Sequence, residues 1–448
     1  MTRRRTWGVA VTVGICLGAT ASVAAQDAPQ LTREQILQRI EALEVELAQL
    51  KAAVEQKSPT ATKAGTEQYT EQEKAGTDYL HDLKYGVSLD TYYGYNFNRP
   101  IGRVNLLRAY DVLSNNFTIS QAGVVLEMTP HVEAHRPFGA RVDLQYGQAT
   151  ETLQGSLANE PRPWVYRNIF QAYGTYIAPV GSGLTIDFGK WASSLGYESN
   201  YNKDQINYSR SYWFDFLPFY HTGGRLHYQL NGAVGLNYWI TNGTQQTEAF
   251  NNFKDQLGGV VLQPTKTVTW TINYYLGQEH PDVQIVTQPG LPTVPTQPGL
   301  SIIPVNPYFR GKLQIFDSYV SWQPATATTV VFEGDYVTNQ NPNASASRVA
   351  GGAAYLRREL SRRTAIGLRG EYLNDPNGLF STESQRLGEA TVTYDIRVND
   401  GFLVRTEYRR DMSNVPFFLT STVDARKKWQ DTATLGLIWW WGTKREAW

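Results

Sequence analysis

The chain has 448 residues, no net charge and a high content of aromatic residues. Lysine and arginine together number 41, as do aspartate and glutamate, so no strong basic field predicts a nucleic-acid partner. A mean hydropathy of −0.40 is too polar for a bundle of membrane-spanning helices. Such a value is compatible with a transmembrane β-barrel, in which half of each strand and the loops are polar.

Residues 1–25 are typical of a secretory signal peptide, with an uncleaved membrane anchor as the alternative. Three arginines at positions 3–5 precede an apolar stretch, and Val23 and Ala25 fit a cleavage site. Cys16, the one cysteine of the chain, lies inside this segment. The exported chain would therefore have no cysteine for disulfides, thiol catalysis or zinc binding.

Residues 26–57 predict a periplasmic helix with a coiled-coil seam. Its apolar residues are spaced alternately by four and three positions, as a two-position heptad core requires. We expect a stalk that joins protomers or tethers the barrel, with a solitary amphipathic helix as the alternative. The predicted core residues are Ile36, Ile40, Leu43, Leu47, Leu50 and Val54. Residues 58–82 have few large apolar side chains and predict a flexible linker.

From residue 83 to residue 448, polar and apolar residues alternate in many short segments. "RVDLQYG" (141–147) has Arg141, Asp143 and Gln145 on one face and three apolar side chains on the other. About sixteen such segments predict strands. Their expected starts are residues 85, 115, 137, 168, 182, 221, 231, 257, 266, 311, 326, 347, 363, 385, 401 and 430.

The connections between these strands alternate between short turns and longer loops. Transmembrane barrels have this alternation, with short periplasmic turns and an even number of strands. The polar face repeatedly carries Arg, Asp and Glu, which a dry protein core does not accept unpaired. We therefore expect an all-β fold, a transmembrane antiparallel β-barrel of about sixteen strands over residues 83–448. A secreted β-sandwich or adhesin is the alternative.

The same region resembles a known family along most of its length. The stretches "YGYNFNRP", "NNFTISQAGVVLE", "LTIDFGKWAS", "NYSRSYWFDFLPFYHTGGRL" and "LRGEYLNDPNGLF" follow one another as in the OmpL-like outer-membrane β-barrel porins. The resemblance implies a porin-like barrel and no particular substrate. One departure is that six residues follow Gly442 and end on Trp448, so the terminal aromatic of the barrel is either Trp448 or an internal residue such as Trp441.

The inner face of the barrel predicts a set of pore-lining residues of mixed charge. The alternative is that these charges pair across neighbouring strands and only solvate the lumen. The predicted lining residues are Arg141, Asp143, Gln145, Asp187, Glu333, Asp335, Arg369, Glu371, Arg405 and Glu407, with Arg409 on the same wall.

The third long loop, about residues 192–220, is the candidate for a constriction inside the barrel. Its charged residues are Glu198, Lys203, Asp204, Arg210 and Asp215, and rings of charge select ions by sign and size. Its aromatic run, "SYWFDFLPFY" (211–220), favours an interfacial girdle over a sugar-stacking track.

The remaining motifs do not indicate a catalytic or metal-binding site. "HVEAH" (131–135) lacks the spacing of a helical metal site, and no catalytic motif marks an enzyme, so we expect no metal, cofactor or catalytic residue. The repeated "TQPGL" in residues 287–300 predicts a turn-rich outer loop.

Together these observations predict a bacterial outer-membrane porin. Small hydrophilic solutes or ions would diffuse passively through a water-filled lumen. The expected partners are outer-membrane lipid, these solutes and further copies of the chain joined through the coiled coil, with no nucleic acid. The alternatives are a channel that prefers sugars or anions and a plugged barrel that anchors the envelope.

Overall fold

The structure is a computed structural model. It describes residues 45, 82–154, 160, 162–280, 283–285, 302–304, 311–340, 345–444 and 446–448. The predicted signal peptide, the coiled-coil core residues, the linker up to residue 81 and the "TQPGL" repeat lie outside the described residues.

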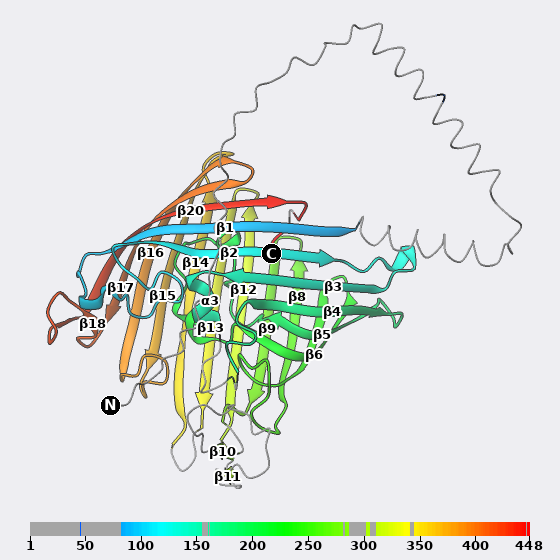
Figure 1. The fold of residues 1–448 in the computed structure, drawn as a ribbon, viewed down its shortest axis with the longest axis horizontal. Coiled ribbons are helices and arrows are strands. Elements are labelled where there is room, and N and C mark those ends of the chain that lie inside the picture. The colour runs from blue at the N-terminus through cyan, green and yellow to red at the C-terminus, as the bar shows by residue number, and fades with distance from the viewer. Residues whose placement is uncertain are drawn as a thin grey trace, which may run out of the picture. The chain divides into compact units, whose positions relative to one another are not determined.

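Sixteen antiparallel strands close into one barrel (Figure 1), which confirms the predicted fold class and strand number. Each predicted start lies within three residues of the observed one. The barrel strands are β1 (Leu83–Asn96), β2 (Asn116–Met128), β3 (Phe138–Tyr146), β4 (Ile169–Ala178), β5 (Leu184–Ala192), β6 (Tyr220–Asn231), β7 (Val234–Thr241), β8 (Asp255–Thr265), β9 (Val268–Gly277), β12 (Leu313–Ala325), β13 (Thr328–Asn339), β14 (Ser347–Glu359), β15 (Thr364–Asp375), β16 (Gln385–Asn399), β17 (Phe402–Ser413) and β20 (Trp429–Gly442).

The smaller elements lie in the connections. They are the paired strands β10 (Val283–Ile285) and β11 (Ile302–Pro304), the paired strands β18 (Phe418–Leu419) and β19 (Arg426–Lys427), the 3-10 helices η1 (Ile101–Arg103), η2 (Val132–Ala134) and η3 (Asn202–Asp204), and the helices α3 (Gln148–Leu153) and α4 (Tyr212–Phe216). Within the described ranges, no helix has the length and apolar character needed to cross a membrane.

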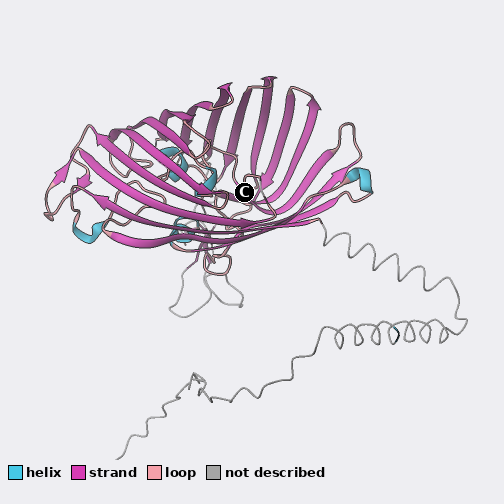
Figure 2. Cartoon of the chain, turned by 90° about the horizontal axis from the view of Figure 1, so that it is seen from above, coloured by secondary structure: helices cyan, strands magenta, loops and turns pink. Residues whose placement is uncertain are grey.

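The barrel closes where its first strand meets its last. β1 pairs with β20 from Gly86 opposite Gly442 to Asn96 opposite Thr432. Full closure leaves no strand edge unpaired, which is what a sheet surrounded by lipid requires. Figure 2 shows the strands curving around short helices and loops that lie inside the barrel.

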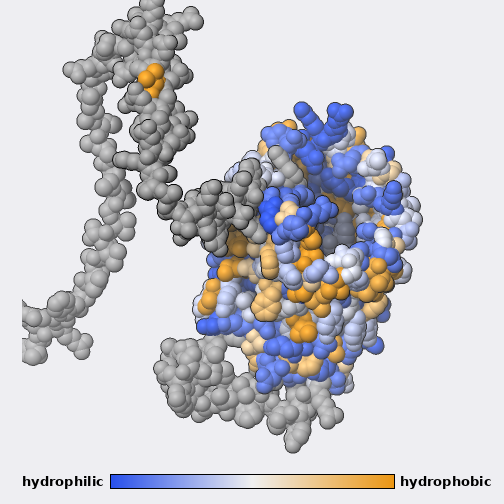
Figure 3. Space-filling model, turned by 90° about the vertical axis from the view of Figure 1, so that its right-hand side faces the viewer, coloured by the Kyte–Doolittle hydropathy of each residue, from blue (hydrophilic) through white to orange (hydrophobic). Residues whose placement is uncertain are grey.

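The apolar side chains of the strands face outward. On β5, Phe188 is 76% exposed, whereas its neighbour Asp187 is 6% exposed on the inner side. On β3, Val142 is exposed, whereas Asp143 and Gln145 are buried. Figure 3 shows hydrophobic residues gathered across the middle of one outer face, with hydrophilic residues above and below them. The two-faced segment "RVDLQYG" therefore turns its apolar side to the outside of the barrel.

The connections alternate in length as predicted. β6 and β7 are joined by residues 232–233, and β16 and β17 by residues 400–401, whereas β5 and β6 are separated by residues 193–219. All short turns lie at one end of the barrel and all long loops start from the other, because neighbouring strands are antiparallel. The "HVEAH" segment, with η2 inside it, lies at the short-turn end.

Candidate functional site

The long loop between β5 and β6, residues 193–219, folds into the barrel; we call it the inner loop. Tyr208, Tyr212 and Trp213 are each 0% exposed, although none of them belongs to a strand. The loop includes η3 and α4, and Ser211 caps α4 by accepting a hydrogen bond from the Phe214 N–H at 2.9 Å. The inner loop thus fills lumen space that the strands enclose.

The middle of the inner loop is bonded to the first strands. The Tyr201 hydroxyl donates to Asp143 on β3 at 3.0 Å, and the Tyr208 hydroxyl donates to Asp90 on β1 at 2.9 Å. The Asn202 amide also donates to Asp90. These contacts satisfy two buried carboxylates that lie far from the loop in sequence, so they fix its position against this side of the wall.

Beyond β20 along the wall, three arginines on β15 and β17 hold carbonyl groups of the inner loop. Arg369 on β15 donates to the Ser209 carbonyl at 2.7 Å. Two residues of β17 do the same: Arg405 donates to the Gln205 carbonyl at 2.8 Å and Arg409 to the Arg210 carbonyl at 2.5 Å.

Each of these arginines also bonds a carboxylate on the wall. Arg369 pairs with Glu389 at 2.8 Å, Arg405 with Asp395 at 2.7 Å and Arg409 with Asp411 at 2.7 Å. A guanidinium has five N–H donors in a fixed plane, so one side chain serves an acid and a carbonyl together. The alternative considered in the sequence analysis, in which lumen charges pair across neighbouring strands, therefore applies on this wall.

Carboxylates of the wall accept the backbone N–H groups of the inner loop. Glu407 on β17 accepts from the N–H groups of Tyr208 at 2.6 Å and Ser209 at 2.9 Å. Glu371 on β15 accepts from the Tyr212 N–H at 2.9 Å. Charged acceptors make stronger hydrogen bonds than neutral ones, so these bonds add to the hold of the arginines.

The predicted constriction residues serve mainly the fold of the inner loop. Glu198 pairs with Arg369 at 2.7 Å and accepts from the Ser211 N–H at 2.6 Å. Arg210 donates to the Asn202 side chain at 2.6 Å and lies over the ring of Tyr110. Neither charged group points freely into open lumen.

The other three candidates lie on the two short helices of the loop, Lys203 and Asp204 on η3 and Asp215 on α4. Lys203 pairs with Asp204 at 2.8 Å, and Asp204 accepts from the Trp448 N–H at 3.0 Å. Asp215, on α4, is half-buried, and this enclosure raises the pKa of its carboxyl group to about 6.

The predicted aromatic girdle in residues 211–220 is wrong. Tyr212 and Trp213 are buried inside the barrel, where the Tyr212 hydroxyl donates to Asp411 at 2.8 Å. Aromatic rings with polar atoms suit both a lipid interface and a lumen that offers acceptors, so their composition does not separate the two. The helix α4 and its Ser211 cap direct these rings inward.

A second part of the wall, on β5 and β6, holds its charges differently. Arg225 pairs with Asp187 at 2.6 Å, and its side chain is 24% exposed, against 0% for Arg369. Further along β6, His227 and the Asn237 side chain lie 2.9 Å apart. Among the hydrogen bonds of the described residues, none joins the inner loop to β7 or β8.

All ten predicted lining residues lie on the inner side of the wall. Nine are buried, and Arg141 is half-buried while it pairs with Asp143 at 2.9 Å and Glu127 at 3.3 Å. Most of them touch the inner loop or a neighbouring charge rather than open space. The ten are Arg141, Asp143, Gln145, Asp187, Glu333, Asp335, Arg369, Glu371, Arg405 and Glu407.

Sequence reasoning missed several residues that hold the interior together. Arg108, in the β1–β2 loop, pairs with Asp111 and with Asp411, both at 2.7 Å. Trp448 packs its ring against Tyr201 at 5.4 Å between ring centres. Neither lies in a segment with strand periodicity, so no local pattern marks them.

Comparison with known proteins assigns the barrel to a family. A family model described as "Putative beta-barrel porin-2, OmpL-like" matches residues 82–439. The chain belongs to this family of OmpL-like β-barrel porins. The family places this porin in the bacterial outer membrane. No curated protein matches the chain.

Several solved structures are similar to this porin at low identity. In-vitro folded OmpT, an outer-membrane protein of Vibrio cholerae, is 10% identical with a TM-score of 0.49, over 80% of this chain and 97% of that one. The outer-membrane channel DcaP of Acinetobacter baumannii is 9% identical with a TM-score of 0.48, over 80% and 96%. An anion-selective porin from Comamonas acidovorans is 7% identical with a TM-score of 0.48, over 80% and 99%.

Proposed function

We propose that this porin lets small hydrophilic solutes or ions diffuse through the lumen along β5, β6 and β7. The carrying observation is the partly exposed side chain of Arg225, which pairs with the buried Asp187 on the inner wall. Hydrogen bonds of the described residues join the inner loop to β1, β3, β9, β12, β13 and β15–β17 and to the start of β6, whereas none joins it to β7. Trp239 of β7 is buried in one apolar cluster with Leu195 and Leu217 of the inner loop, so space for water is expected beside Arg225 and from there towards the short turns.

The lining of that path is polar and of mixed charge. Asp187 accepts hydrogen bonds from Thr175 at 2.5 Å and from Arg225 at 2.6 Å, and Arg225 lies over the ring of Tyr173. Both signs of charge lie side by side, so a single ion sees little net field. Weak charge selectivity and transport driven by the solute's own gradient follow from this arrangement.

The remainder of the chain completes the proposal. Residues 1–25 direct export and are removed, residues 26–57 form a periplasmic helical stalk, and residues 58–82 link it to the barrel of residues 83–448. The apolar heptad positions support association of copies through this stalk. The short-turn end of the barrel then faces the periplasm, as in other outer-membrane barrels.

A plugged barrel that anchors the envelope is the second candidate. It is favoured by the buried charged groups that bind the inner loop around the wall, among them Asp90 on β1, Glu407 on β17 and Glu333 on β13. A barrel whose lumen is closed by the inner loop would conduct little. Its function would then be to anchor the envelope through the stalk.

Single-channel conductance of the refolded chain from residue 26 onward separates the two candidates. Conductance steps that scale with bulk conductivity at two salt concentrations support the diffusion pore. A barrel that inserts without conductance steps favours the anchor.

Single cysteines then locate the path, because Cys16 is the one cysteine of the sequence and precedes residue 26. We expect a charged methanethiosulfonate reagent to change the current of Arg225→Cys. The matched control is Thr393→Cys, since Thr393 is 0% exposed beneath the inner loop. Equal responses of both variants, or none from Arg225→Cys in an open channel, would contradict this path.

A further inference from the structure

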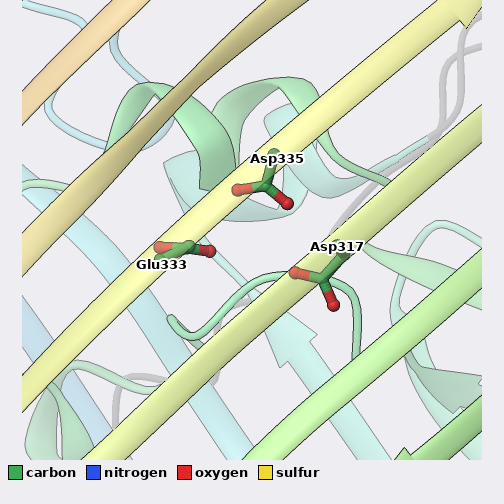
Figure 4. A group of neighbouring side chains, drawn as sticks. All are labelled: Asp317, Glu333 and Asp335. Carbon is green, nitrogen blue, oxygen red and sulfur yellow. The ribbon is translucent and has the colours of Figure 1, made fainter.

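Three carboxylates gather on the inner face of β12 and β13. Asp317 on β12 stands directly opposite Asp335 on β13 in the strand register, and Glu333 lies two residues before Asp335 on the same face. One oxygen atom from each of the three lies within 4.8 Å of the others. Figure 4 shows the three side chains close together on the two neighbouring strands. Like charges directly opposite one another on a sheet are destabilising, so the cluster needs compensation.

Elsewhere in the lumen, arginines pair with buried carboxylates, whereas the described residues include no such partner for this cluster. Glu389 and Asp395 are paired with arginines at 2.8 and 2.7 Å. Among the ion pairs of the described residues, by contrast, none includes Asp317, Glu333 or Asp335. Among the described residues, no cationic side chain therefore neutralises the three acids.

Two of the three carboxylates are satisfied by neutral donors. Asp317 accepts from the Gly196 N–H at 3.0 Å and from the Asn273 amide at 2.8 Å. Glu333 accepts from the Tyr197 N–H and from the Tyr355 hydroxyl, both at 2.8 Å. These donors hold the two groups in place beside Asp335.

Asp335 has no such donor. It is 4% exposed, and neither of its carboxylate oxygens accepts a hydrogen bond from the part of the chain that the structure describes. Its strongest charged neighbours are Glu333 and Asp317, which add negative charge around it. A buried carboxylate without a partner normally coordinates a cation or gives up its charge.

We propose that Asp317, Glu333 and Asp335 bind one calcium ion. Carboxylate oxygens are the ligands that hard divalent cations prefer, and water completes the coordination of the ion. Oxygens that lie within 4.8 Å of one another can reach a single ion, and calcium accepts irregular coordination that magnesium, with its strict octahedral geometry, does not. The site does not depend on whether the lumen conducts.

The bound ion ties the wall to the inner loop. Gly196 and Tyr197 belong to the start of that loop, and their N–H groups bind two of the proposed ligands. Calcium would keep those two carboxylates ionised and in place, and thus keep both acceptors in position for the loop. Calcium binding is therefore expected to stiffen the entry of the loop into the lumen.

Terbium luminescence of the refolded, EDTA-treated barrel tests the site. Terbium takes the same oxygen ligands as calcium and is excited through a nearby tyrosine, here Tyr355 at 2.8 Å from Glu333. We expect luminescence that added calcium abolishes and that magnesium displaces less readily. Asp335→Asn should weaken binding by about tenfold or more, and it should still fold because Asp335 makes no hydrogen bond that the change would break.

Asp187→Asn is the matched control, since Asp187 is a buried strand aspartate of the same lumen outside the cluster. It should bind terbium as the unchanged chain does. Heat-modifiable migration in electrophoresis verifies that each variant is folded. A folded, unchanged barrel without calcium-reversible luminescence would overturn the proposal and show that the cluster holds protons instead. Equal weakening in both variants, or in neither, would place the ion elsewhere and overturn it as well.

Discussion

Two parts of the inner wall carry arginines on the same face of the same barrel, yet they use them in different ways. On β15 and β17, Arg369, Arg405 and Arg409 are 0–1% exposed and hold carbonyl groups of the inner loop as well as acids of the wall. On β6, Arg225 is 24% exposed and pairs with Asp187. An inward charge in a barrel strand is therefore not by itself a pore-lining group, because a loop from elsewhere in the chain decides its role.

The largest expected effect comes from removing an arginine of the enclosed wall. Arg405→Ala would leave the carbonyls of Gln205 and Asn207 without their donor and the carbonyl of Asn202 with only the Gln205 N–H. We expect the free energy of unfolding to fall by about 3–5 kcal/mol, with larger and noisier conductance as the loop loosens. Denaturant unfolding in lipid vesicles measures the first effect and bilayer recording the second. Arg225→Ala is the control, with an expected change of about 0–1 kcal/mol; equal losses would remove the distinction between the two walls.

The close approach of the inner loop to the wall can be tested with a single methyl group. A Cβ at Gly367 on β15 would lie 2.6 Å from the Ile206 carbonyl oxygen, which is backbone and has little room to move. We expect Gly367→Ala to lower the free energy of unfolding by about 1–3 kcal/mol.

Gly235→Ala on β7 is the matched control for Gly367→Ala. Its Cβ would meet the ends of the Gln229 and His227 side chains at 3.1 and 3.2 Å, and these can turn aside. Thermal unfolding followed by circular dichroism compares the two variants. A larger loss for Gly235→Ala would mean that the loop is not packed against β15.

The accessible wall should control ion preference with little effect on stability. Arg225→Gln removes a positive charge while Asp187 keeps its bond from Thr175. We expect the reversal potential in a salt gradient to shift toward cations, with a change in unfolding free energy of about 0–1 kcal/mol. Thr393→Ala on the enclosed wall serves as the comparison, and a reversal potential that shifts equally there would contradict the assignment of the path.

The smallest expected effect is a pH dependence of the inner loop. Burial raises the pKa of Asp215 from 3.8 to about 6, so the docked loop favours the neutral acid. This stability is fully present below pH 3.8 and is lost as the pH rises through about 6. The shift corresponds to about 3 kcal/mol, which nearby water reduces to about 1 kcal/mol. Conductance should therefore rise from acid to neutral pH, and Asp215→Asn should reduce this rise; an unchanged profile would show that other groups control it.

The strands of the barrel could be predicted from the sequence because their signal is local. Segments such as "TIDFGKW" alternate with a period of two, and the hydrocarbon outside and polar interior both act on that period. The alternation of turn lengths followed from antiparallel pairing. These features do not depend on which strand lies across the barrel.

The interior could not be predicted in the same way because it depends on contacts across the barrel. Tyr208 and Asp90 are 118 residues apart in the chain, and nothing near either predicts their bond. Its composition predicts that the aromatic run of α4 lies at the lipid interface. Composition does not tell whether a loop lies outside or inside the barrel wall. Asp317 and Asp335 were recognised as neighbours only through the strand register, which the local pattern does not fix.

The seam between β1 and β20 has a consequence for biosynthesis. Gly86 and Gly442 pair across it, so the first strand meets its second partner only when the last strand of the chain has joined the sheet. An open edge in hydrocarbon costs several kcal/mol for each unpaired backbone group. Insertion into the membrane and closure of the sheet should therefore be one coupled event. The inner loop binds the β15–β17 wall as well as β1 and β3, so it can complete its hydrogen bonds only after both parts of the wall have joined the barrel.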